Sequence, residues 1–123
     1  EELVEKTLVG RDARPRYSGA ARRITIPGSA LEKYGMISEY RMAFLVAVVR
    51  LAMGPEIIGN CTHEPNLLGA AAGANFFWAE VGSNPRDTSS ETSEGRGHGI
   101  ADCRNLLKET DYDILNGPSR IYG

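Results

Sequence analysis

A run of five polar residues is the best candidate for a binding site in this sequence. The run follows a short apolar segment, residues 56–59, and precedes a segment rich in small residues, residues 66–74. It consists of Asn60, Cys61, Thr62, His63 and Glu64. If it ends a strand, side chains alternate between the two sides of the sheet, so Cys61 and His63 share one side. One set of side chains could bind a polar substrate while the other begins the following helix.

A cysteine two residues from a histidine also suggests a metal ion. Two ligands do not make a site, because zinc sites take three or four protein ligands. His98 and Cys103, five residues apart, form a second possible ligand pair, for which an exposed loop histidine and a helix-anchoring cysteine is the simpler interpretation. We therefore expect no metal site, and residues 60–64 either contact substrate or serve the fold.

A second apolar segment, residues 75–81, carries two more candidates. In a strand, Phe76, Trp78 and Glu80 would share one face, and Phe77 would lie on the packing face. Glu80 is the last residue of the aromatic face and Asn84 begins a polar stretch, so both are candidate substrate contacts. The aromatic side chains better suit core packing.

The elements that must position these residues alternate between strand and helix. The longest predicted helix, residues 38–53, has Ser38 as its N-cap and ends at Gly54. Shorter helices are expected at residues 1–9 (ending at Gly10), 66–74 and 100–108. Three parallel strands are expected at residues 23–26, 57–61 and 76–81, with residues 11–23 read as a loop. This alternation predicts an α/β fold with a parallel sheet, whose strand carboxyl ends meet at one rim.

The chain length bounds this fold. With 123 residues it can form one domain, but a complete eight-fold barrel needs roughly 250 residues. We expect a single domain, residues 1–123, that forms part of a TIM-type barrel. It would include a polar loop at residues 84–99 and a C-terminal helix and tail at residues 100–123. The absence of methionine before Met36 suggests an excised or processed piece.

Composition narrows the possible partners and location. A net charge of −2 gives no bulk reason to expect nucleic acid, and no apolar run is long enough to span a membrane. Two cysteines fit a reducing compartment, so a cytoplasmic location is expected. One local exception is a cluster of arginines in which Asp12 is the single acidic residue. This cluster is either a solvated surface or an anion site. The cluster comprises Arg11, Arg14, Arg16, Arg22 and Arg23.

The order of several motifs resembles the C-terminal part of biotin synthase-like radical SAM enzymes. These motifs are IPGSAL (26–31), a long apolar helix ending in RLAMG (50–54), AAGANFFW (71–78) and SNPRD (83–87). The group includes biotin synthase, the tyrosine lyase of thiamin synthesis and the maturases of hydrogenase cofactors. Within it, the Fe-hydrogenase cofactor maturase looks nearest.

The resemblance implies a role in cofactor biosynthesis, with S-adenosyl-L-methionine cleaved at a 4Fe-4S cluster and a small-molecule substrate held in the barrel. The turn after the first strand would lie near S-adenosyl-L-methionine, which makes Ile26, Pro27, Gly28 and Ser29 the implied cofactor contacts. The family's three-cysteine cluster loop is missing here, so the cluster ligands would lie on sequence outside this chain, and no catalytic residue is assigned.

Other interpretations stay open beside the resemblance. The open sheet edges predict association with a missing N-terminal barrel portion or with a second copy. A non-catalytic accessory domain that binds a small molecule or a partner is one competing interpretation. A fragment of a non-radical TIM-barrel enzyme is another, because fold alone does not fix function.

Overall fold

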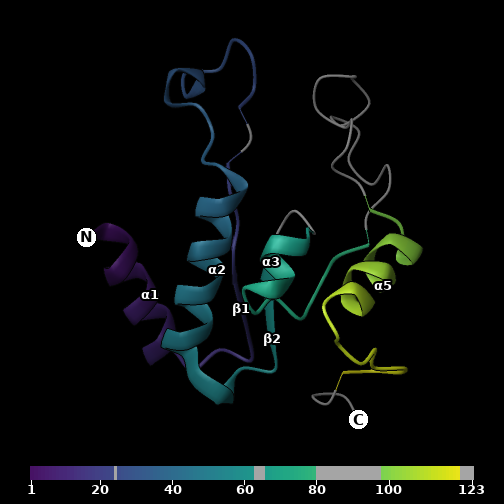
Figure 1. Cartoon of the computed structure of the whole chain (residues 1–123). Helices are drawn as coiled ribbons and strands as arrows, with labels where there is room; N and C mark the ends of the chain where they lie inside the picture. Colours follow the sequence, from purple (N-terminus) through teal and green to yellow (C-terminus); the bar gives the residue numbers. More distant parts are fainter. Residues whose placement is uncertain (24, 63–65, 80–97, 120–123) are drawn as a thin grey trace.

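The computed structural model describes residues 1–23, 25–62, 66–79 and 98–119 (Figure 1). Within these ranges the chain is a mixed α/β structure whose two-stranded parallel sheet is not closed into a barrel. None of the helices in the same ranges combines the length and apolarity needed to cross a membrane.

The longest helix, α2 (Glu39–Met53), confirms the sequence prediction at both ends. The Ser38 hydroxyl accepts a hydrogen bond from the backbone N–H of Arg41 at 3.1 Å, which satisfies one of the free donors of the first turn. Gly54 ends the helix with φ +68°, a conformation that favours glycine. Both ends are therefore set by local chemistry.

The sheet pairs β1 (Tyr17–Ala20) with β2 (Gly59–Thr62), and α2 lies between them in the chain. The second strand was predicted near its observed position. The prediction of the first strand at residues 23–26, and of a loop throughout residues 11–23, was wrong. After β1 the chain leaves the sheet: the Arg23 guanidinium donates to the carbonyls of Leu31 and Gly35, and Ile26 is 56 % exposed. Hydrogen bonds within residues 23–35 hold this segment as a loop despite its β-propensity.

The third predicted strand is reduced to one residue pair. Phe76 makes a parallel bridge with Cys61, and residues 77–79 form no strand, while residues 80 and 81 lie outside the described ranges. The Asn75 side chain makes hydrogen bonds to β2 and the residue before it that a strand backbone would otherwise make. Its Oδ1 accepts from the Asn60 N–H at 2.8 Å, and its Nδ2 donates to the Ile58 carbonyl at 3.2 Å. The predicted parallel direction is confirmed at this bridge.

The remaining helices flank this unit. α1 (Glu2–Asp12) does not end at Gly10, as the sequence predicted. It continues to Asp12, and Gly10 lies close to Met53 at the end of α2. α3 (Leu67–Ala71) begins at Asn66, whose side chain accepts the Gly69 N–H at 2.7 Å. α5 (Ile100–Glu109) follows the prediction for residues 100–108. Two short 3-10 turns are η1 (Glu32–Tyr34) and η2 (Gly54–Glu56).

The core lies between α2, the segment that follows α3 and one face of the sheet. Met42, Val46 and Ala74 form its buried cluster, and Phe77 packs against that cluster as expected for the packing face. Many large apolar side chains elsewhere stay exposed, among them Leu51 on α2 and Leu67 on α3. The chain thus buries one side of its sheet well and leaves other apolar surfaces uncovered.

Candidate functional site

The two faces of the sheet differ in what covers them. Asn60 and Thr62 face the helices and are completely buried. The Asn60 Nδ2 donates to the Val46 carbonyl of α2 at 3.3 Å and to the Gly73 carbonyl after α3 at 3.2 Å. Its Oδ1 is buried with no hydrogen-bond partner among the residues described. Asn60 therefore ties β2 to both helical segments, although the sequence made it a candidate substrate contact.

The opposite face, which we call the open face, is built on two glycines and Cys61. A Cβ atom on Gly19 would lie 2.3 Å from the Cys61 sulfur and 2.4 Å from the Cys61 carbonyl oxygen. A Cβ atom on Gly59 would lie 2.6 Å from the Tyr17 ring. Since no such contact is sterically possible, glycine at both positions lets neighbouring side chains lie flat over the strands.

Three aromatic rings form a row along the open face. The ring centroids of Tyr17 and Phe76 are 5.3 Å apart, and those of Phe76 and Trp78 are 4.9 Å apart in an edge-to-face arrangement. Trp78 remains 49 % exposed. Aromatic rings in such arrangements are rigid, apolar surfaces suited to a flat ligand.

The C-terminal segment turns the edge of this face into a groove of about 600 Å³. Its walls include Tyr17, Phe76 and Leu107, and the segment around Tyr112 to Ser119 closes the other side. The Tyr17 hydroxyl is hydrogen-bonded to the Ser119 hydroxyl, which holds that segment against β1. The volume and the mostly apolar lining are those of a small-molecule pocket.

The two thiols near Trp78 are held in the neutral form. Burial raises the pKa of Cys61, partly offset by hydrogen bonds from its own backbone and from Trp78. Burial and the Asp102 carboxylate raise the pKa of Cys103, whose thiol lies 3.7 Å from the Trp78 carbonyl oxygen. A neutral thiol is a weak nucleophile and a poor metal ligand. No cluster of three or more His, Cys, Asp or Glu side chains suited to a metal occurs in the described ranges, so these residues do not fit a 4Fe-4S cluster.

The other predicted contacts are dispersed. His63, Glu64, Glu80 and Asn84 lie outside the described residues. The predicted cofactor turn follows β1 at some distance, in the loop that extends beyond the N-terminal end of α2 in Figure 1. Its members are Ile26, Pro27, Gly28 and Ser29. Gly28 there has φ +75°, and its N–H donates to the Glu32 carboxylate at 2.8 Å.

Sequence reasoning missed the residues that shape the open face. Tyr17 and Gly19 fell in a predicted loop because YSGA lacks the β-branched pattern of a strand. The Tyr–x–Gly spacing, with alternate residues on one face, was the available signal.

The chain matches no protein-family model, no curated protein and no solved structure.

Proposed function

We propose that this chain is the C-terminal, substrate-side portion of a radical SAM enzyme of the biotin synthase-like group, active in cofactor biosynthesis. The observation that carries the proposal is the winding of the sheet. β1, β2 and the Phe76 bridge are parallel and adjacent in chain order, and α2 and Ala74 pack on one face. Consecutive β-α units of a TIM-type barrel are wound in this way.

In this reading the open face is the inner wall of a barrel. Tyr17, Phe76 and Trp78 would contact a flat or apolar part of a small-molecule substrate and exclude water from it. The Tyr17 and Ser119 hydroxyls at the groove could orient polar substrate atoms. His63, Glu64, Glu80 and Asn84 remain predicted substrate contacts at the strand ends.

The reaction itself would come from cofactors bound elsewhere. S-adenosyl-L-methionine and a 4Fe-4S cluster supply radical chemistry when bound, and the protein then contributes orientation and shielding. The two cysteines of this chain are too few to hold the cluster, so the proposal implies that its ligands would lie on further sequence. The neutral thiols of Cys61 and Cys103 agree with a passive wall, since neither is activated as a nucleophile.

A second candidate function has its own support. The groove beside Tyr17 is enclosed by this chain's own C-terminal segment. A non-catalytic domain that binds a small molecule would need no more than such a groove. The two functions differ in whether the open face is completed by further barrel strands.

Anaerobic reconstitution of the protein encoded by the complete reading frame separates the two candidates. With iron, sulfide and a reductant, the radical enzyme should bind about four irons per cluster and convert S-adenosyl-L-methionine to 5′-deoxyadenosine. The 123-residue chain alone serves as the control and should bind no cluster. A complete protein that forms no cluster, or that never cleaves S-adenosyl-L-methionine, would refute the radical SAM assignment.

A further inference from the structure

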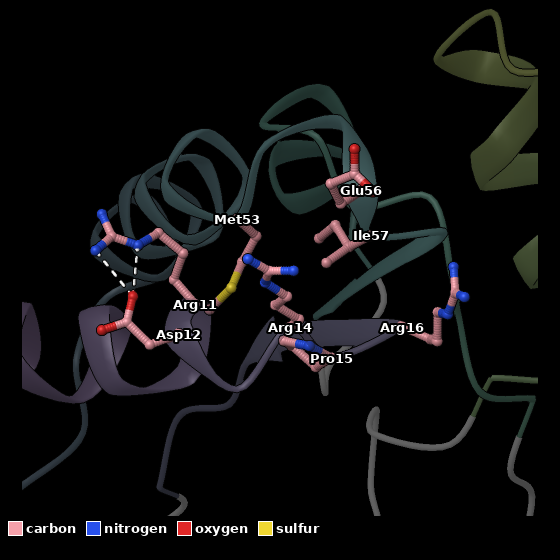
Figure 2. A pocket seen from close by; sticks show the side chains of 8 residues that line it. All are labelled: Arg11, Asp12, Arg14, Pro15, Arg16, Met53, Glu56 and Ile57. Atoms are coloured by element: carbon pink, nitrogen blue, oxygen red, sulfur yellow. Dashed lines mark hydrogen bonds and ion pairs between the residues drawn. The ribbon is translucent and has the colours of Figure 1, made fainter.

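A second hollow, of about 920 Å³, lies at the opposite end of the strands from their carboxyl rim. It is bounded by the ends of α1 and α2 and by the residues that lead into β1 and β2 (Figure 2). Met53 and the buried Ile57 give it an apolar floor, and three arginines surround that floor. The arginine cluster noticed in the sequence therefore has a defined place in the fold.

The three arginines are not equivalent. Arg11 is paired with the Asp12 carboxylate, with nitrogen–oxygen distances of 3.0 and 3.1 Å. The guanidinium groups of Arg14 and Arg16 make no hydrogen bond or ion pair with any residue that the structure describes. Figure 2 shows the Arg14 side chain rising between Met53 and Ile57, with Arg16 at the far edge. Two cationic groups thus border the hollow without a partner among the residues that the structure describes.

The backbone at Arg14 is a second, independent observation. Arg14 has φ +50°, in the left-handed region that a non-glycine residue rarely adopts. It follows the C-cap Ala13 of α1, where the residue in this conformation is usually glycine. Glycine would serve the turn better, so the turn does not explain the arginine. Residues held in such conformations cluster at ligand-binding sites.

Other charges near the hollow do not neutralise these guanidinium groups. Glu56 lines the same hollow without an ion pair among the described residues, and Asp12 is already engaged by Arg11. The C-terminal ends of α1 and α2 add partial negative charges of about half an elementary charge each, and these are screened by water. A guanidinium group binds carboxylate or phosphate through paired hydrogen bonds, which neither a helix end nor Glu56 supplies here.

We propose that this hollow binds the oxyanion group of a small molecule, with Arg14 as the main contact, Arg16 as a second cation, and Met53 and Ile57 beneath the ligand's apolar part. Phosphate and carboxylate groups share the chemistry that these arginines recognise. The site is separate from the open face, so it stands or falls independently of the radical SAM assignment.

Titration of the ¹⁵N-labelled 123-residue chain with inorganic pyrophosphate and, separately, with glutarate tests the proposal. At least one anion should shift the amide signals of residues 11–16 and 53–57 saturably. Selective binding of pyrophosphate identifies a phosphate ligand, and selective binding of glutarate a carboxylate ligand. Arg14→Gln should weaken binding about tenfold or more, because it removes the charge and the paired donors. The exposed Arg104→Gln, on α5, is the matched control and should bind as the wild type does.

Arg14→Gly provides a second variant that keeps the left-handed turn without strain. It should fold at least as well as the wild-type chain and should also lose binding. Saturable binding that survives both Arg14 substitutions would overturn the proposal. The proposal would also be overturned if neither anion bound saturably. It would be overturned as well if Arg14→Gln lowered the melting temperature but left anion binding unchanged.

Discussion

The two faces of the β1–β2 sheet come from alternate residues of the same eight paired residues, yet they differ in what covers them. On the helix side, Asn60 and Thr62 are fully buried against α2 and α3. On the open face, Gly19 and Gly59 carry no side chain, and Trp78 stays half exposed. The first face is completed by the chain's own helices, whereas the second presents a row of aromatic rings and a groove.

The difference predicts which face governs stability and which face has room for a ligand. A face sealed by buried amide hydrogen bonds and close packing resists change, and substitutions there should cost folding energy. A face built on glycine and aromatic rings has room for a ligand or for further protein. Variants that exchange these properties test the distinction, and their expected effects fall in the following order.

Gly19→Ala should have the largest effect on folding. The added methyl group would overlap the Cys61 backbone, which cannot move without breaking the β1–β2 pairing. We expect a loss of about 3 kcal/mol in the free energy of unfolding. Gly59→Ala is the matched variant, and it should cost less because its methyl group meets the Tyr17 ring, which can rotate away. Urea unfolding followed by circular dichroism measures both, and equal losses would contradict the backbone argument.

Asn75→Ala removes the side chain that substitutes for a third strand. The Asn60 N–H and the Ile58 carbonyl would lose their partners. Leaving such groups unpaired in a partly buried place should cost about 2 kcal/mol. The exposed Asn105→Ala on α5 serves as the control in the same urea experiment. If the two variants were equally stable, Asn75 would not be a structural joint.

Tyr17→Phe should have a smaller effect, confined to the groove. It removes the hydrogen bond to Ser119 and keeps the ring beside Phe76. We expect a loss of about 1 kcal/mol and faster amide exchange in residues 112–119. Tyr40→Phe, on the exposed surface of α2, should change neither quantity. Unchanged exchange in the C-terminal segment would show that this hydrogen bond does not hold it.

The thiols should give the smallest effect, visible as a pH dependence. Since burial raises the pKa of both thiols, the folded chain holds these protons more tightly than the unfolded chain. This contribution to stability is complete below the ordinary thiol pKa, about 8.5, and is lost as the pH rises through the folded values. The wild-type chain should therefore lose more stability between pH 8 and pH 10 than Cys61→Ser/Cys103→Ser. Identical slopes for the two proteins would contradict the burial argument.

The sequence predicted an element well where neighbouring residues determine its structure, and poorly where residues distant in the chain determine it. Ser38 and Gly54 fix the ends of α2 through their own neighbours, so both ends were predicted correctly. β1 was missed because Tyr17–Ala20 becomes a strand through pairing with β2, about forty residues later. The apolar segment at residues 76–81 suggested a full strand, but the side chain of Asn75 pairs with β2 where backbone would have been expected.

The candidate site was predictable in part for the same reason. Alternation along β2 correctly separated Cys61 from Asn60 and Thr62. It could not show which side the helices would cover, so the buried amide of Asn60 was placed among the substrate contacts. The hollow at Arg14 is formed by two segments distant in sequence, residues 11–16 and 53–57, and composition alone favoured a solvated surface over an anion site.

The central claim is that the open face is enclosed in the complete protein, and alkylation of Cys61 tests it most directly. The rate of iodoacetamide labelling at Cys61, measured by mass spectrometry, should be compared between the 123-residue chain and the protein encoded by the complete reading frame. Cys103, already buried against Trp78, is the internal reference. Enclosure by further barrel strands predicts that Cys61 labelling slows about tenfold or more relative to Cys103. The same relative rate in both proteins would show that the face stays open, and would contradict the barrel account.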